Sequence, residues 1–442
     1  MKIKKILNRG LFLVLFVILT FSGFISNAQE EKIMYGNTPD SVFPYNNFQK
    51  AYKYHFVEPM IGFHGAGREK KAPTDLTEVR IGFLGPLDED SPIVDLGNQM
   101  LNGCVLAIEQ ANERGGYKGI PYKLMVHNDV GLWGAAANEV VKMDDEGVWA
   151  WLGSIDDIVS HVALRATLKC EIMEVNTGDP DPTFTETNIP WMIRVVSDDR
   201  QSSYALANYI YGKKGHDRIA VIRTGARYGR VGVMEFLGVA NRMGHPVRME
   251  ERFVEGETDF SLQIGNIKKE NPDAILIWGN AKEMGLIVNQ IREMGMDQPI
   301  YTSDRAVSEE FLEITGDNAN GIITTCQYNP KSDNPDLKKF QADYLERFGE
   351  NANVFATHAF DGMNLIIKAI EKEGLNRVLI RDVLTDRKTF QNYEGVTGKI
   401  TLDPSWNDVG EIFMAEIKDG EFNFFPAAQM KERGHSQTMP GY

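Results

Sequence analysis

The three cysteines are the side chains of this 442-residue sequence with the widest covalent and metal chemistry, but their spacing supports neither. Cys104, Cys170 and Cys326 lie far apart and form no Cys-x-x-Cys pair of the kind used for redox chemistry or metal binding. We therefore expect buried free thiols. A single disulfide, formed in an oxidising compartment, is the alternative, and the sequence does not select its pair.

The motifs that would support catalysis or cofactor binding are missing from the sequence. The first predicted strand, 79–84, is followed by Gly85-Pro86-Leu87 and not by the Gly-x-Gly-x-x-Gly loop that cradles a dinucleotide. A Gly-x-Ser-x-Gly motif is also absent, and His55 and His64 have no further metal-type ligands beside them. We expect a binding protein with no catalytic residue, cofactor or metal; an enzyme of the doubly wound class is the weaker alternative.

An export signal precedes the body of the chain. Four basic residues stand before an apolar stretch from Leu11 to Ile25, and small residues follow up to Ala28. The stretch is shorter than the roughly 20 residues that span a bilayer, so cleavage after Ala28 is favoured over a membrane anchor. Loss of these basic residues takes the formal charge from −15 to −19. We predict a periplasmic protein, without direct membrane insertion after cleavage, whose acidic surface excludes nucleic acid as a partner and suits a small polar ligand.

Strands and helices alternate from Val79 onward, and the pattern restarts after a polar stretch at 197–201. This alternation predicts two doubly wound α/β lobes with parallel sheets covered on both faces, and a ligand site facing the carboxyl ends of the strands. The predicted strands are 79–84, 122–126, 148–152, 172–175, 218–222, 246–253, 274–277 and 300–301, with a final strand pair at 399–402 and 412–417. The predicted helices are 100–108, 135–143, 162–168, 203–211, 232–243, 260–269, 284–294, 337–348 and 356–373.

Three sequence blocks carry a resemblance to a known family: 79-VRIGFLGPL-87, 98-NQMLNGCVLAIEQANERGG-116 and 218-RIAVIRTGARYGR-230. Together they resemble the type I periplasmic binding proteins, and within them the leucine/isoleucine/valine-binding group. The further matches 256-GETDFSLQIGNIKKENPDAILIWG-279 and 311-FLEITGDNANGI-322 extend the likeness over roughly 78–425. The resemblance implies two lobes that are joined by a three-strand hinge and enclose a ligand when they close.

The implied function is that of a soluble substrate-binding component of an ABC-type uptake system. It would capture a small polar solute, such as an amino acid, amine or amide, and present it to an ABC permease or membrane sensor. The alternative is an interaction module on the same fold that docks a periplasmic or membrane partner without a ligand. The expected domains are a signal peptide (1–28), an extension that is a strap or a docking segment (29–76), lobe one (77–197 plus 328–407), lobe two (198–327 plus 408–425) and a polar tail (426–442).

Two matched positions keep the residue types that the family uses at its ligand. Asp304 matches an acidic residue that binds the ligand's ammonium group, a role that suits a carboxylate because charge-assisted hydrogen bonds are strong. Tyr228 matches a tyrosine that lines the cleft. The alternatives are that Asp304 caps a helix beginning near Val307 and that Tyr228 packs against a neighbouring helix.

Other matched positions differ from the family. Asp157 and Pro180 stand where amino-acid binders place hydroxyl residues for the ligand's carboxylate, which an aspartate would repel. Leu96, Asn280 and Phe360 replace aromatic residues, and the family's disulfide positions fall at Gly131 and Asp156. The predicted site comprises Leu96, Asp157, Gly178, Asp179, Pro180, Tyr228, Asn280, Asp304 and Phe360.

The aspartates at this site favour one class of ligand over another. Asp156, Asp157, Asp179, Asp181 and Asp304 would make the cleft mouth acidic, which favours an amine, amide or polyol over a zwitterion. Alternatively, several of them cap helices or face solvent. A calcium site is the remaining alternative, although the spacing matches no recognised calcium loop.

Overall fold

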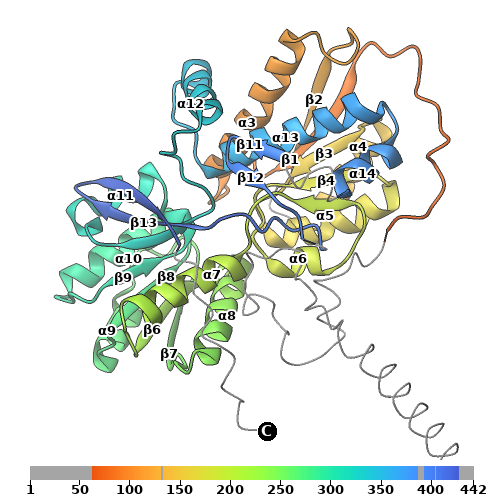
Figure 1. Ribbon diagram of the computed structural model, residues 1–442. Coiled ribbons are helices and arrows are strands. Elements are labelled where there is room, and N and C mark those ends of the chain that lie inside the picture. Colours follow the sequence, from red (N-terminus) through yellow and green to blue (C-terminus); the bar gives the residue numbers. More distant parts are fainter. Residues whose placement is uncertain (1–61, 131–132, 387–392, 404, 428–442) are drawn as a thin grey trace, which may run out of the picture. The chain divides into compact units, whose positions relative to one another are not determined.

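The computed structural model describes residues 62–130, 133–386, 393–403 and 405–427 (Figure 1). The predicted signal peptide, residues 29–61 of the predicted extension and the tail beyond residue 427 lie outside the described residues. Within the described ranges, every helix is too short or too polar to cross a membrane.

The first half of the described chain builds a five-stranded parallel sheet. Its strands are β1 (Val79–Gly85), β2 (Tyr122–Asn128), β3 (Ala150–Gly153), β4 (Met173–Asn176) and β5 (Met192–Arg194), in the order β2-β1-β3-β4-β5. The helices between them are α3 (Val94–Glu113), α4 (Trp133–Asp145), α5 (Asp157–Cys170) and α6 (Pro182–Glu186).

Both faces of this sheet are covered by an apolar core. Successive strand residues point to opposite sides, so neighbouring apolar residues belong to different cores. Leu152 of β3 belongs to the core on the side of α3, whereas its neighbour Trp151 belongs to the core on the side of α4 and α5. The same alternation separates Phe83 from Leu84 on β1. The predicted two-faced parallel sheet is confirmed.

The second sheet has seven strands in the order β14-β13-β10-β9-β8-β6-β7 (Figure 1). The strands are β6 (Ile219–Thr224), β7 (Met249–Phe253), β8 (Ala274–Trp278), β9 (Ile300–Thr302), β10 (Ile323–Cys326), β13 (Phe413–Lys418) and β14 (Glu421–Pro426). Its helical segments are α7 (Asp199–Ala207), η2 (Asn208–Lys213), α8 (Arg227–Arg242), α9 (Ser261–Glu270), α10 (Ala281–Glu293), η3 (Asp304–Ala306), α11 (Glu309–Thr315) and η4 (Gly316–Ala319).

Three connections run between the two sheets. The chain passes from β5 to α7, returns after β10, and crosses again before β13. Between the second and third crossings it forms α12 (Pro335–Phe348), α13 (Val354–Glu373), α14 (Arg377–Thr385) and a small hairpin of β11 (Tyr393–Gly395) and β12 (Gly398–Ile400). Helix α13 packs against α3, so this return segment completes the first core. The lobe boundaries inferred from the family pattern stay a prediction.

The two predicted final strands are present as β12 and β13, but they do not pair with each other. Strand β12 pairs with β11, whereas β13 pairs antiparallel with β10 and β14, with Thr324 opposite Ala415. The reason lies in the side chains of β13: Met414 belongs to one core of the second sheet and Ile417 to the other. Burial on both faces therefore places β13 in that sheet.

The predicted free thiols are confirmed. Cys104, Cys170 and Cys326 are all unpaired; the first and last are buried, and Cys170 is partly exposed.

The described part of the N-terminal extension lies on the body of the protein. The ring of Phe63 meets the buried Trp191 edge-on at 5.0 Å, and the Nε of Arg68 lies 2.7 Å from the Asp382 carboxylate. Asn376 caps α14 and donates a hydrogen bond to the Gly67 carbonyl at 2.9 Å. Residues 63–68 make the contacts expected of a strap.

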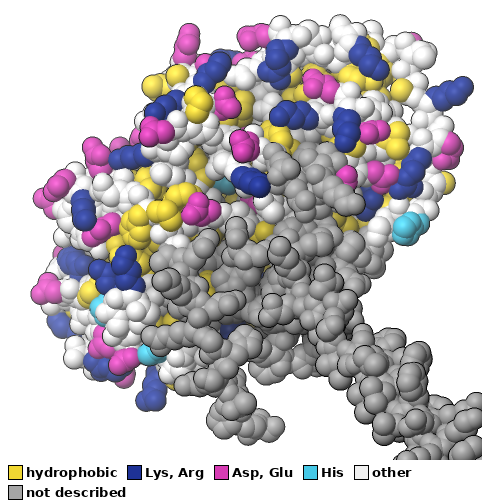
Figure 2. Space-filling view, in the orientation of Figure 1, with side chains coloured by type: hydrophobic (Ala, Val, Ile, Leu, Met, Phe, Trp, Pro, Cys, Tyr) yellow, Lys and Arg dark blue, Asp and Glu magenta, His cyan; other side chains and the backbone are white. Residues whose placement is uncertain are grey.

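Acidic and basic side chains are interspersed over the face shown in Figure 2. Its described residues show no gathering of Lys and Arg of the kind that binds nucleic acid, in keeping with the acidic composition. Across the described ranges, no cluster of three or more His, Cys, Asp or Glu side chains is arranged to hold a metal ion.

Candidate functional site

Most predicted site residues lie just beyond the carboxyl ends of parallel strands. In a doubly wound sheet, loops at this edge are free to converge on a ligand. Asp157 follows β3, the 178–181 loop follows β4, Tyr228 follows β6, Asn280 follows β8 and Asp304 follows β9.

Asp304 and Tyr228 are joined in the structure. The Tyr228 hydroxyl donates to Asp304 Oδ1 at 2.6 Å, and the Gln327 side-chain amide donates to Oδ2. Asp304 caps no helix with its side chain: Ser303 precedes η3, and Ser308 caps α11. The alternative that Asp304 serves as a helix cap is therefore excluded, and its carboxylate is held in place by two side chains.

Arg305 adds a positive charge beside this pair. Its guanidinium carbon lies 3.7 Å from the centre of the Tyr228 ring, a cation–π contact, and Nη1 donates to Asn280 Oδ1 at 2.6 Å. Asn280 sits at the N-cap of α10 but makes no capping bond with its side chain. The predicted residue Asn280 thus orients Arg305. Arg305 itself was not among the site residues predicted from the sequence.

Asp157 and Asp179 form a buried acidic pair from the first sheet. Asp157 is 3% exposed and Asp179 is fully buried. When both groups are ionised, neither oxygen of Asp157 receives a hydrogen bond from the described residues, nor does Oδ2 of Asp179. The two carboxyl groups lie within hydrogen-bonding reach of each other, so one proton between them would join them. Burial, together with the charges of Asp179 and Asp181, raises the pKa of Asp157 well above its usual value. Burial also raises the pKa of Asp179.

The loop that carries Asp179 is tightly built. The Asn176 side chain accepts hydrogen bonds from the backbone N–H groups of Gly178 and Asp179, at 3.2 and 2.9 Å. A Cβ at Gly178 would lie 2.9 Å from Ile155 Cγ1, so a larger residue would displace the loop. Pro180 is buried, and its carbonyl accepts from Asp199 N–H at 2.9 Å.

Asp181 joins this loop to the second sheet. It caps α6 through Thr183 N–H at 2.8 Å, and its other oxygen lies 2.5 Å from Arg227 Nη2 at the start of α8. Burial raises the pKa of Asp181, but hydrogen bonds from His161 and Thr183 and the charge of Arg227 outweigh it and lower the pKa below its usual value. Asp181 is thus a cap and an ion-pair partner. Asp156 caps α5, so the capping alternative is correct for these two aspartates.

Asp199, at the start of α7, is an acidic group that the sequence reasoning missed. It is 1% exposed, and its Oδ2 lacks a donor among the residues described. Burial and the charges of Asp304 and Asp181 raise the pKa of its carboxyl group well above the usual value. The residue lies five positions beyond the end of β5, at the first position of α7, and this place after a buried strand is the signal that marks it.

Leu96 and Phe360 lie elsewhere. Phe360 belongs to the first apolar core, with its ring 4.6 Å from that of Phe340, and Leu96 is a partly buried residue packed against the same core. Their roles at a ligand stay a prediction.

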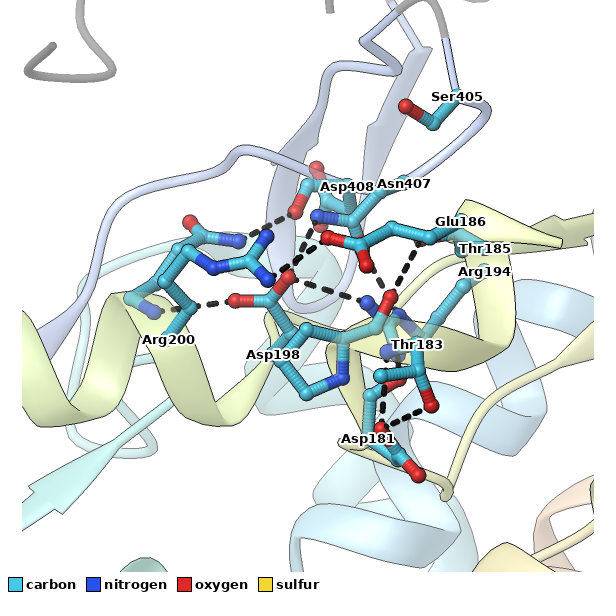
Figure 3. Close-up of polar contacts among 12 residues, drawn as sticks. Asp181, Thr183, Thr185, Glu186, Arg194, Asp198, Arg200, Ser405, Asn407 and Asp408 are labelled. Carbon is cyan, nitrogen blue, oxygen red and sulfur yellow. Dashed lines mark hydrogen bonds and ion pairs between the residues drawn. The ribbon is translucent and has the colours of Figure 1, made fainter. Parts of the chain in front are cut away.

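Arg194 connects the acidic loop to two of the crossing segments (Figure 3). Its fully buried guanidinium donates to the Asp181 carbonyl at 2.5 Å, to Asp198 Oδ2 at 3.1 Å and to Asn407 Oδ1 at 2.7 Å. Asn407 also donates to Asp198 at 3.1 Å. The position of the loop after β4 therefore depends on the same side chain that ties the first and third connections together.

The third connection contains two further buried carboxyl groups. Asp403 Oδ1 accepts hydrogen bonds from the N–H groups of Ser405 and Asn407, and Asp408 Oδ1 accepts from those of Thr401 and Gly410. Burial raises the pKa of each to about 7.

These two groups predict a pH-dependent stability. Because the folded pKa exceeds the unfolded value, the folded state binds more protons, so their contribution to stability falls as pH rises from about 4 through 7. Asp408→Asn keeps the Oδ1 acceptor and removes the titration, so the decline between pH 5 and pH 8 should be shallower in urea unfolding. An unchanged decline would contradict this assignment.

Comparison with known proteins decides the family. A model described as periplasmic binding protein matches residues 78–421. The chain belongs to this family. The periplasmic binding proteins similar to it include Leu/Ile/Val-binding protein homolog 2 of Brucella abortus, 23% identical over 80% of this chain and 94% of the relative. The leucine-, isoleucine-, valine-, threonine-, and alanine-binding protein of Pseudomonas aeruginosa is 22% identical over 67% of this chain and 79% of its own length.

Solved periplasmic binding proteins share the fold. The leucine-binding protein LivK of Thermotoga maritima superposes with a TM-score of 0.71 and 26% identity, covering 78% of this chain and 97% of that protein. A solute-binding protein from R. palustris, in complex with benzoate, has a TM-score of 0.72 and 16% identity, covering 79% and 96%. The type I periplasmic binding protein fold predicted from three sequence blocks is confirmed. All four of these proteins carry names that describe them as binding proteins.

Proposed function

We propose that this protein is the substrate-binding component of an ABC-type uptake system and captures a small polar solute through its ammonium or amide N–H groups. The observation that carries the proposal is the set of buried carboxyl groups after β3, β4 and β5 whose oxygens lack donors within the described chain. Burying such a group costs free energy unless a partner satisfies it. A ligand N–H group placed there would remove that cost.

The predicted residues divide into roles within this proposal. Asp304, held by Tyr228 and Gln327, would bind the ligand from the second sheet, and Asp157 and Asp179 would bind it from the first. The R. palustris solute-binding protein is named as part of an ABC transporter, which supports an ABC permease as the partner. A periplasmic location after cleavage of residues 1–28, and capture by closure of the two lobes, belong to the same proposal.

A thermal-shift screen of the purified protein against amino acids, amines, amides and polyols tests this function. A ligand present at 100 times its Kd should add about 2.7 kcal/mol to the unfolding free energy. Asp304→Asn should weaken binding of that ligand at least about tenfold, because a charge-assisted hydrogen bond is lost. Asp297→Asn is the matched control, since Asp297 is exposed between α10 and β9.

A cooperative unfolding transition that no compound moves would contradict solute capture. That result would favour the interaction module that docks a protein partner without a ligand.

A further inference from the structure

The buried side-chain atoms left without hydrogen bonds at the candidate site share one property. Asp157 Oδ1 and Oδ2, Asp179 Oδ2, Asp199 Oδ2 and Gln327 Oε1 are all acceptors, and none has a donor in the described part of the chain. Each belongs to a residue that is at most 9% exposed. A carboxylate and an amide oxygen both require N–H or O–H groups. The ligand that satisfies them must therefore be rich in donors.

Hydrogen bonds and an ion pair join these residues into one cluster. Asp199 N–H donates to the carbonyl of Pro180, which lies between Asp179 and Asp181 in sequence. Asp181 pairs with Arg227, and the next residue, Tyr228, donates to Asp304. The acceptors therefore belong to one site that draws on both sheets.

The charges of this cluster do not balance. Five buried carboxyl groups, those of Asp157, Asp179, Asp181, Asp199 and Asp304, are accompanied by two guanidinium groups. Arg227 is paired with Asp181, and Arg305 lies over the Tyr228 ring beside Asp304. His161 adds a contact to Asp181, at 3.3 Å. A further guanidinium nearby, that of Arg194, is paired with Asp198. Asp157, Asp179 and Asp199 thus have no ion-pair partner among the described residues.

The neighbouring pair of Asp157 and Asp179 can reduce the excess by sharing one proton. Two carboxyl groups buried side by side cannot both ionise cheaply, and the burial that raises the pKa of both favours one bound proton. This pair then carries one negative charge, and Asp199 would carry a second one once a cation beside it offsets the burial that raises its pKa. They lie on different elements, after β3 and β4 on one side and after β5 on the other.

We infer that the ligand class is a short aliphatic diamine without a carboxylate, with one ammonium group at Asp157 and Asp179 and the other at Asp199. The inference rests on the proposed capture of a small solute and names its chemistry. Each ammonium group brings three donors and one positive charge. The Gln327 oxygen offers a further acceptor. A ligand carboxylate, in contrast, would lie among groups that repel it.

Isothermal titration calorimetry with a matched series tests the inference. The probes are 1,4-diaminobutane, n-butylamine, which lacks one ammonium group, and L-ornithine, which adds a carboxylate and the α-amino geometry of an amino acid. We expect 1,4-diaminobutane to bind at least about tenfold more tightly than either of the other two probes. The monoamine lacks one charged hydrogen-bonding group, and L-ornithine carries a carboxylate that the site repels. The homologues 1,3-diaminopropane and 1,5-diaminopentane test which distance between the two ammonium groups the site prefers.

The variant Asp199→Asn separates the two ends of the ligand. It should weaken the binding of 1,4-diaminobutane at least about tenfold and the binding of n-butylamine much less, since the monoamine can still bind at Asp157 and Asp179. Asp297→Asn should change neither affinity, and a native-like melting transition shows that each variant is folded.

Equal affinity for the diamine and the monoamine, or tighter binding of L-ornithine, would overturn the diamine inference. Binding of an amide or a neutral amino acid without the diamine would overturn it and leave solute capture standing. No binding by any compound in either panel would overturn both.

Discussion

Replacing Arg194 with methionine should lower the unfolding free energy by about 3–5 kcal/mol, the range for removing one partner of a buried ion pair. The Arg194 side chain is fully buried and donates to Asp198, Asn407 and the carbonyls of Asp179 and Asp181 (Figure 3). Methionine fills a similar volume but donates no hydrogen bond. Two carbonyls and a carboxylate would then lose this donor in a place that water reaches poorly.

The matched control is Arg218→Met. Arg218 pairs with Asp273 at 2.9 Å, but its side chain is 61% exposed, and exposed ion pairs contribute less than about 1 kcal/mol. Urea unfolding of both variants measures the difference. Losses of similar size would show that the network around Arg194 contributes no more than a surface pair.

Arg194→Met should also weaken ligand binding. The guanidinium holds the carbonyls on both sides of Pro180, and so fixes the loop that presents Asp179. Ligand titration of the folded variant checks this consequence. An unchanged affinity would show that the loop keeps its position without Arg194.

The fold was predictable because its signals are local. Apolar runs such as 79–84 and 274–277 are buried on both faces, and each is bounded by polar or glycine residues that end the strand. Their alternation with amphipathic helices leaves a parallel sheet as the arrangement that buries both faces. The order of family-like blocks then supplied the two-lobed topology.

The pairing of β13 could not be predicted in the same way. Its partner β10 is distant in the sequence, and the hairpin that precedes β13 offers a nearer partner. The family resemblance assigned 408–425 to lobe two, but in the residues themselves only the burial of Met414 and Ile417 in two separate cores distinguishes the alternatives, and burial is a property of the assembled structure.

The candidate site was predictable in part for a related reason. Asp157, Asp179 and Asp304 follow strands, so their positions at the sheet edge could be inferred from the pattern. The same pattern cannot distinguish Asp156, which caps helix α5, from its neighbour Asp157, which caps no helix. The difference depends on which carboxylate accepts a hydrogen bond from a helix N–H group. Asp199 lies in the polar stretch 197–201, where the sequence does not distinguish a buried carboxylate from a solvent-exposed one.

Asp157→Asn should raise the stability of the ligand-free protein at pH 7 while it weakens ligand binding at least about tenfold. The binding loss follows because the amide replaces one carboxyl oxygen, an acceptor, with an N–H donor that cannot bind a ligand N–H group. The stability gain follows from the raised pKa of Asp157, for which burial is the first cause and Asp179 the second. At pH 7 the unfolded chain holds this carboxyl ionised, whereas the fold must bind a proton or bury a charge without a donor.

The sign of the pH effect distinguishes this explanation from improved packing. A carboxyl whose folded pKa is raised stabilises the fold least above that pKa, and its penalty disappears as pH falls towards its unfolded value of about 4. The gain in Asp157→Asn should therefore be present at pH 7 and close to zero near pH 4. Thermal unfolding at both values measures it, with Asp297→Asn as the exposed control. A variant less stable than the parent at pH 7 would mean that the fold already satisfies Asp157, and the argument for a cationic ligand at this carboxyl group would fail with it.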